Sequence, residues 1–421
     1  MAQDYPIRPI DDSELPAFGE VAHHAFASSW SADQMVDHDR MVFMPERSLA
    51  ACDGDRIVGT AVAYPFGLTV PGGAVDAAAV SFVSVLPSHR RRGILSALMR
   101  RQLTDVSHGT EPVAALFASE AAIYGRFGYG SAAPSQSFDV RRGDGRVQIP
   151  VASGSAAADE VPVLRLAEPK AAVKELAEVY DAIRPDRPGM ITRDERWWNY
   201  VLADPEFARE GESPLRGVIA EGRSGPRGYA VYTTKSAWDG DGVPCGALTV
   251  HELFGIDPVA IAALWADMLS RDLMGEVTAR RRPIDDPLPY LLPDPRRVRS
   301  RASDGLWIRI VDLPAALRRR RYSCQVDVVI EVVDDLLPAN SGTWRLVAGG
   351  PADQSDPACD RSAAPADIRL PISALGAVYL GGTRLGGLAA AGLITELQPG
   401  AITALSAAMW WDPAPWSPIM F

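Results

Sequence analysis

Apolar residues along the first 140 positions change their spacing several times, and these changes predict alternating helices and strands. A helix is expected after Asp12, because Leu15, Phe18, Val21, Ala22 and Ala25 recur at helical spacing behind a polar start. The runs Ser48–Cys52 and Ile57–Tyr64 flank a Gly-Asp turn and predict a hairpin. Further along we expect strands over Val75–Leu86, Pro112–Ala118 and Ser135–Arg141 and helices over Arg92–Ser107 and Ala121–Phe127.

Beyond residue 142 the same kinds of signal return twice. The Gly-, Ala- and Ser-rich segment Gly143–Ala158 predicts a linker. The following stretch echoes the first part without its glycine-rich turn, with strands expected over Val161–Leu166, Leu215–Glu221 and Gly228–Thr234 and helices over Pro169–Ile183, Arg193–Leu202 and Val259–Arg271. After a proline-rich passage, Pro283–Pro295, a third region is expected, with strands over Leu306–Val311, Cys324–Val333 and Thr343–Gly349 and helices over Pro371–Tyr379 and Thr383–Leu388. A chain of 421 residues is also too long for one ordinary core, so two or three domains are expected.

Charge and composition narrow the class of partner. The formal net charge of −11 argues against a nucleic-acid partner and favours cationic partners or substrates. The chain has no run of about 18 apolar residues and no export signal at its start, which predicts a cytoplasmic protein without a membrane span. The four cysteines have no metal or disulfide spacing and are expected to be reduced thiols: Cys52, Cys245, Cys324 and Cys359.

The most informative segment joins a strand to a helix through a basic turn. The strand that ends at Leu86 is followed by Ser-His-Arg-Arg-Arg-Gly and then by a helix. Free N–H groups of a first helical turn, together with the helix dipole, stabilise an anion. Gly93 lets the backbone approach closely, and Arg90–Arg92 add positive charge. Arginines at the start of a surface helix are, by themselves, more often solvated than bound to a phosphate. Other motifs in the chain therefore decide which interpretation holds.

The chain contains such additional motifs. Arg90–Leu95 is similar to the pyrophosphate motif Arg/Gln-x-x-Gly-x-Gly/Ala of the GNAT superfamily of N-acetyltransferases, with Leu95 in place of the small residue. The chain also resembles the Eis (enhanced intracellular survival) family within that superfamily. The segments that carry this resemblance lie in order along nearly the whole chain: Ser88–Met99, Ala118–Gly130, Asp285–Leu292, Asp304–Leu317, Tyr379–Arg384 and the terminal Phe421.

The resemblance implies an α/β fold with mixed α+β sheets, namely two tandem GNAT-like domains followed by a sterol-carrier-protein-like α+β domain. We place the acetyl-CoA-binding catalytic domain at 1–148, a degenerate GNAT-like domain at 149–300 and the sterol-carrier-like domain at 301–421. The family further implies a homohexamer in which the first fold alone binds acetyl-CoA, with no metal. The implied cofactor contacts are the strand residues Val83, Ser84 and Val85, the turn residues Arg91, Arg92, Gly93, Ile94, Leu95 and Ser96, and Ser119 and Glu120.

Two groups are implied at the acyl centre. Tyr124 stands in Tyr-x-x-x-Gly-Tyr, which is similar to a segment near the CoA sulfur in this superfamily, and we assign it as general acid. A phenol with an ordinary pKa near 10 stays protonated at neutral pH and can protonate a departing thiolate. Tyr129, close by, is expected to be structural. In the Eis family the base is the α-carboxylate of the last residue, here Phe421, and the apolar tail before it predicts that this end is docked.

The remaining candidate residues give weaker evidence of a function. The six histidines stand in no triad or metal spacing and are expected to be structural or at the surface. Trp197 and Trp198 are compatible with a substrate pocket or with core packing. The function expected is acetyl-CoA-dependent N-acetylation of the primary amines of a small cation, by resemblance an aminoglycoside, which would confer antibiotic resistance. Lysine side chains or metabolite amines are the alternative substrates. Leu95 keeps open a different class, a CoA-sensing or apolar-ligand-binding regulatory protein.

Overall fold

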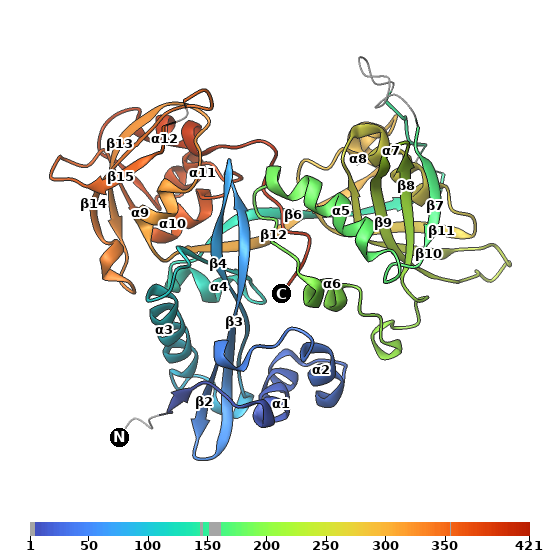
Figure 1. Ribbon diagram of the computed structural model, residues 1–421, viewed down its shortest axis with the longest axis horizontal. Coiled ribbons are helices and arrows are strands. Elements are labelled where there is room, and N and C mark those ends of the chain that lie inside the picture. The colour runs from blue at the N-terminus through green and yellow to red at the C-terminus, as the bar shows by residue number, and fades with distance from the viewer. Residues whose placement is uncertain (1–4, 144–145, 151–160, 354) are drawn as a thin grey trace. The chain divides into compact units, whose positions relative to one another are not determined.

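The structure is a computed structural model that describes residues 5–143, 146–150, 161–353 and 355–421. The chain folds into two compact units. Their helices and strands are labelled in Figure 1. Unit 1 consists of Met1–Ala133, Asp186–Tyr200 and Asp304–Phe421, and unit 2 consists of Pro134–Pro185 and Val201–Ser303. Most of the predicted linker, at 144–145 and 151–158, lies outside the described residues. No helix within the described ranges is long and apolar enough to cross a membrane.

The N-terminal part of unit 1 is a sheet with the strand order β1-β2-β3-β4-β5-β12. The first four strands are antiparallel, β4 and β5 are parallel, and β12 pairs antiparallel with β5. Helices α1 and α3 both pack on β3 and β4. The bounds are β1 (Ile7–Arg8), α1 (Leu15–Phe26), α2 (Ala32–Asp39), β2 (Ser48–Asp53), β3 (Arg56–Val70), β4 (Gly73–Val85), α3 (Ile94–Ser107), β5 (Val113–Phe117), α4 (Ala121–Tyr124) and β12 (Arg299–Ile310).

A bulge in β4 opens this sheet. Between the pairs Thr60–Ser84 and Val62–Ser81, the two β4 residues Phe82 and Val83 stand opposite one residue of β3. Phe82 has a φ of 52°, which kinks the strand as a bulge does. The ladder between β4 and β5 runs over Ala77–Ala79 of β4, before the bulge, so the two strands diverge beyond it. The bulge and this divergence place the C-terminal half of β4 at the edge of an opening in the sheet.

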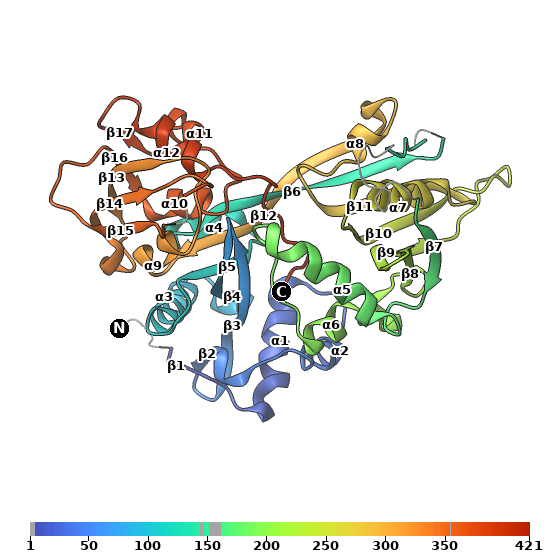
Figure 2. The ribbon, with the colours of Figure 1, turned by 45° about the horizontal axis from the view of Figure 1, so that its top comes forward.

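The C-terminal part of unit 1 is a second sheet with the order β15-β14-β13-β16-β17 (Figure 2). Helices α9, α10 and α12 pack on its strands. A buried ion pair, Arg309 Nη2 to Asp334 Oδ1 at 2.7 Å, joins β12 to the end of β13. The bounds are α9 (Leu313–Arg318), β13 (Val326–Val333), β14 (Gly342–Ala348), β15 (Ala358–Arg361), β16 (Ile368–Pro371), α10 (Ile372–Val378), α11 (Leu385–Ala390), β17 (Thr395–Glu396) and α12 (Ala401–Met409).

Unit 2 contains the strand order β6-β11-β10-β9-β8-β7, of which β6 enters the unit at Pro134. Its strands β10 and β11 are parallel and are joined through α7, as β4 and β5 of unit 1 are joined through α3. Trp265 of α7 is fully buried in its core. The bounds are β6 (Gly130–Arg141), β7 (Val163–Ala167), α5 (Val173–Ile183), β8 (Arg216–Gly222), β9 (Gly225–Lys235), β10 (Gly246–Gly255), α7 (Pro258–Ser270), β11 (Met274–Pro283) and α8 (Leu288–Leu291).

Most predicted elements are confirmed to within a few residues. The elements that the sequence pattern missed include α2, β10 and β11. The predicted helix Arg193–Leu202 is α6 (Glu195–Val201).

Candidate functional site

After α12 ends at Met409, the chain runs back along unit 1 as an extended tail. The N–H group of Trp416 donates to the carbonyl of Pro188 at 2.8 Å, and Arg187 donates to the carbonyl of Ala414 at 2.7 Å. Ala414, Trp416 and Ile419 are buried. The tail is therefore held in place along its length.

The tail ends on the bulged strand β4. Ser81 donates from Oγ to the backbone oxygen of Phe421 at 2.7 Å. The Phe421 ring lies 5.7 Å from the ring of Phe66 and 5.4 Å from that of Phe117, measured between centroids. Together these contacts fix the end of the chain beside β4 and β5.

A first pocket, of about 630 Å³, lies where β4 runs into α3, and we call it the cofactor pocket. It is lined by all of the predicted cofactor residues except Arg92, together with Arg90, Arg126, Tyr124 and several neighbours. Arg92 donates instead from Nη1 to the hydroxyl of Tyr5 at 3.0 Å. The pocket therefore gathers the strand, the basic turn and the Ser119–Glu120 segment around one space.

The turn into α3 is shaped for a close approach by an anion. Gly93 has a φ of 84° and precedes the first residue of α3, and no side chain among the described residues caps this helix start. The first N–H groups of α3 are thus available to an acceptor. The space around Gly93 is open, since a Cβ built there would have no atom within 4 Å. Leu95, which departs from the motif, lines the pocket while packing against the buried core beneath α3.

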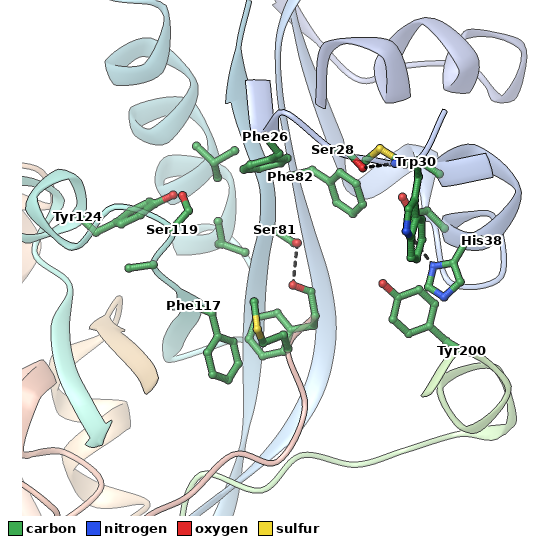
Figure 3. A pocket seen from close by; sticks show the side chains of 17 residues that line it. Phe26, Ser28, Trp30, His38, Ser81, Phe82, Phe117, Ser119, Tyr124 and Tyr200 are labelled. Atoms are coloured by element: carbon green, nitrogen blue, oxygen red, sulfur yellow. Dashed lines mark hydrogen bonds and ion pairs between the residues drawn. The ribbon is translucent and has the colours of Figure 1, made fainter. Parts of the chain in front are cut away.

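A second pocket, of about 510 Å³, adjoins the first, and we call it the acceptor pocket (Figure 3). Its walls come from α1, α2, β4, β5, α4, α6 and the tail. The residues that line both pockets are Phe26, Val83, Ser119 and Tyr124. We call the place where these four residues stand the junction of the two pockets. A group lying there can be contacted from either pocket.

Tyr124 has the environment of a protonated phenol. It is 5% exposed, and burial raises its pKa, while a hydrogen bond with Ser119 acts in the opposite direction. Figure 3 shows the two hydroxyl groups close to each other. Tyr129 lines neither of these pockets, is completely buried, and its hydroxyl has no hydrogen-bond partner among the described residues. Its position matches the structural role expected for it.

The other end of the acceptor pocket was not anticipated from the sequence. There, the Nδ1 atom of His38 lies 3.2 Å from an Asp39 carboxylate oxygen. The His38 ring lies 4.3 Å from that of Tyr200 and 5.4 Å from that of Trp30. Tyr200 shares a hydrogen bond with Asp39, and burial followed by the charge of Asp39 raises its pKa. His38, which we expected to be structural or at the surface, lines this pocket.

A local signal for this region does exist in the sequence. Ser31-Ala-Asp-Gln34 is a capping box, in which Ser31 Oγ accepts from the Gln34 N–H group and Gln34 Oε1 accepts from the Ser31 N–H group. It starts α2, the helix that carries His38 and Asp39. Trp197, by contrast, is buried against Tyr64 and Phe66 with centroid distances of 5.2 and 4.7 Å, so core packing is the correct one of its two interpretations.

Comparison with known proteins defines first the class and then the family. Residues 6–132 and 189–310 each match the model of an acetyltransferase (GNAT) domain, and residues 313–418 match a sterol carrier protein domain. The expected fold class is thereby confirmed, and the chain is an N-acetyltransferase of a class that uses acetyl-CoA.

The family follows from relatives along the whole chain. An uncharacterized N-acetyltransferase of Streptomyces coelicolor is 42% identical over 381 residues, which are 90% of this chain and 89% of that protein. N-acetyltransferase Eis of Mycobacterium tuberculosis is 34% identical over 343 residues, 80% of this chain and 79% of that one. The crystal structure of Eis1 from Mycobacterium abscessus is similar with a TM-score of 0.81 and 32% identity, and it covers 99% of this chain and 100% of its own. The protein belongs to the Eis family, which favours an enzyme over the alternative of a CoA-sensing or ligand-binding regulator.

Proposed function

We propose that the protein transfers the acetyl group of acetyl-CoA directly to a primary amine at the junction of the two pockets. The observation that carries this proposal is the position of Tyr124, which lines both the cofactor pocket and the acceptor pocket. A group that lines both pockets can contact a thioester entering from one and an amine entering from the other.

The residues of the cofactor pocket fit a CoA molecule. The backbone of Val83–Val85 lies along the opening in the sheet, where it can pair with the amides of a pantetheine arm. The start of α3 at Gly93 and the guanidinium group of Arg91 provide donors and positive charge for a pyrophosphate. Bound there, acetyl-CoA supplies an acetyl thioester with a thiolate leaving group.

Two groups of this chain donate and accept the protons of the reaction. When the amine nitrogen bonds to the acetyl carbon, the carbon–sulfur bond breaks, and Tyr124 gives its phenolic proton to the sulfur. The nitrogen loses one proton as the amide forms. With Phe421 as the last residue, its α-carboxylate, held by Ser81, accepts that proton directly or through water. Ser119 hydrogen-bonds the Tyr124 oxygen and keeps the phenol directed toward the junction.

Several finer features are proposed on the family resemblance. They are an aminoglycoside acceptor with one or several acetylated amines, a homohexameric assembly and a cytoplasmic location. Protein lysines and metabolite amines remain the alternative acceptors.

The proposal is tested by the release of free thiol from acetyl-CoA in the presence of a primary amine. Replacing Tyr124 by Phe removes the proton donor, and we expect kcat to fall about 10²-fold or more, in the range typical of lost general acid catalysis. Tyr129→Phe is the matched control, because its hydroxyl lines neither pocket. An unchanged kcat in Tyr124→Phe would remove the phenol from the mechanism. A variant with one residue added after Phe421 tests the carboxylate in the same assay, and undiminished turnover in it would exclude the carboxylate as the base.

A further inference from the structure

The basic turn before α3 has an unusual backbone conformation. It holds two residues in the left-handed region, Arg91 with a φ of 63° and Gly93 with a φ of 84°. Glycine adopts this conformation without strain, whereas a residue with a side chain does not. A strained residue persists only where its surroundings hold it in place. The turn is therefore fixed by contacts beyond its own backbone.

His89 provides such contacts before Arg91. Its side chain is buried, and it lines the cofactor pocket. Nε2 lies 3.2 Å from Oδ2 of Asp53, the last residue of β2, and Nδ1 lies 2.9 Å from Oγ of Ser88. Because a carboxylate only accepts hydrogen bonds, Nε2 carries a hydrogen and donates it to Asp53. Both ring nitrogens are thus engaged, and the imidazole ties the turn to the sheet.

Tyr5 extends this anchor to the other side of Arg91. Its ring lies 6.1 Å from that of His89, edge on, and its hydroxyl accepts from Arg92 Nη1 at 3.0 Å. Tyr5 is itself buried. Arg91 therefore lies between two residues whose side chains both contact Tyr5, and Arg91 lines the cofactor pocket.

A catalytic role for these side chains has to be weighed against a positioning role. Ser88, His89 and Asp53 have the order of contacts of a hydrolase triad, from hydroxyl to imidazole to carboxylate. A serine nucleophile has to reach the acyl carbon. Ser88, however, lines neither the cofactor pocket nor the acceptor pocket. The arrangement therefore favours a positioning role.

We infer that His89, held by Asp53, is a positioning residue for the phosphate groups of the cofactor. It keeps the turn in the conformation in which Arg91 and the first N–H groups of α3 face the same pocket. This inference rests on the proposed phosphate position at the start of α3 and names the groups that maintain it. Two effects of Asp53 then oppose each other. Its negative charge repels a phosphate, whereas its hydrogen bond to His89 favours phosphate binding.

Removing Asp53 separates these two effects. In Asp53→Ala we expect KM for acetyl-CoA to rise about tenfold, the factor that a lost hydrogen bond to a charged group typically costs. Charge alone predicts a lower KM, because a negative charge near the phosphates is removed. Asp55→Ala removes an equal charge from an exposed position two residues further along and is the matched control. Its KM should stay at the wild-type value or fall. A KM that falls or stays unchanged in Asp53→Ala would overturn the inference.

A truncated substrate shows whether the effect is confined to the phosphates. S-acetylpantetheine carries the thioester and the pantetheine arm but has no pyrophosphate and no nucleotide. Its kcat/KM should be nearly equal in the wild-type protein and in Asp53→Ala, because it makes no use of the phosphate position. With saturating acetyl-CoA, kcat should also change little. An equal loss of kcat/KM with both substrates would assign Asp53 to general support of the fold and contradict the inference.

Two variants of His89 test the imidazole itself. His89→Phe keeps an aromatic ring but removes both hydrogen bonds, whereas His89→Gln keeps an N–H donor that can reach Asp53. We expect the Phe variant to raise KM for acetyl-CoA as Asp53→Ala does, and the Gln variant to restore most of the affinity. Circular dichroism shows whether each variant is folded, and the Asp53→Ala comparison decides alone if the Phe variant is not. Equal KM values in two folded His89 variants would refute the role of the hydrogen bond.

Binding can be measured apart from turnover by titration calorimetry of the intact protein with CoA. Weaker binding in Asp53→Ala than in Asp55→Ala supports the inference even if no amine is acetylated, in which case only the proposed function fails. Equal binding in the two variants refutes the inference and leaves the proposed function intact. A wild-type protein that binds CoA no more tightly than pantetheine has no phosphate site at this turn, and the inference is then wrong.

Discussion

The hydroxyl of Ser81 donates a hydrogen bond of 2.7 Å to the backbone oxygen of Phe421, which lies 340 residues further along the chain. Ser81 occupies the strand position next to Phe82, where the bulge begins. The bond therefore ties the end of the tail to the kink that opens the sheet. If the Phe421 carboxylate acts as the base, Ser81 is the residue that positions it.

We expect Ser81→Ala to lower kcat by roughly tenfold, because a hydrogen bond to a charged group contributes about 1.5–3 kcal/mol and aligns the proposed base. KM for acetyl-CoA should change little, since Ser81 does not line the cofactor pocket. Initial rates at saturating amine measure the effect. Ser81→Thr keeps a hydroxyl and should restore most of the rate. Equal losses in the Ala and Thr variants would indicate a packing role instead.

The pH dependence of the rate follows from the raised pKa of Tyr124. Burial raises the pKa above the ordinary value of 10.0, and the acid is active while protonated, that is, below its pKa. The rate at saturating substrates should therefore stay level from neutral pH to about pH 9.5 and decline only beyond 10. Steady-state kcat over this range measures it. A decline with a midpoint between pH 7 and 9 would assign the acid to a different group.

The phosphate turn gives a prediction about binding. Gly93 has a φ of 84°, and a side chain is strained in that conformation by about 1–2 kcal/mol. Gly93→Ala should raise KM for acetyl-CoA about tenfold, because the first N–H groups of α3 would be displaced from the phosphate position. Gly386 in α11 is a matched control, with open space around it and an ordinary helical conformation. Gly386→Ala should leave KM unchanged, and a similar KM in both variants would contradict the proposed phosphate seat.

The sequence predicted most of the elements that frame the cofactor pocket, because the long helix Ile94–Ser107 and its flanking strands have clear hydrophobic periods. The turn at Gly93 was also recognisable, since its chemistry is local. Helix α2 was missed because it has only eight residues and a mostly polar composition, which give a weak hydrophobic period. Its capping box is a clearer sign of the helix than that period. The contacts Ser81–Phe421 and Asp39–Tyr200 join distant segments, and no local pattern encodes them. Arg92 stands at a position of the phosphate motif in the sequence. Its side chain does not line the cofactor pocket, because it donates a hydrogen bond to the hydroxyl of Tyr5 instead.

The last prediction concerns the stability of unit 1. Arg309 and Asp334 are 0% and 2% exposed in their side chains and form an ion pair of 2.7 Å, while Asp334 also accepts from the side chain of Asn340 at 2.9 Å. Asp334→Ala would leave the Arg309 charge buried without its partner, which typically costs about 3–5 kcal/mol. A clear fall in the thermal midpoint, measured by circular dichroism, is expected.

The exposed pair Arg345–Asp327, at 2.6 Å with side chains 56% and 48% exposed, provides the control. Asp327→Ala should cost less than about 1 kcal/mol, because water and salt screen such pairs. The double variant Arg309→Met, Asp334→Leu removes both buried charges and should be more stable than Asp334→Ala alone. If Asp334→Ala and Asp327→Ala shift the thermal midpoint equally, the buried ion pair contributes no more to stability than the exposed one. If the double variant is no better than Asp334→Ala, the loss comes from the hydrogen bonds of Asp334 and not from the unpaired arginine.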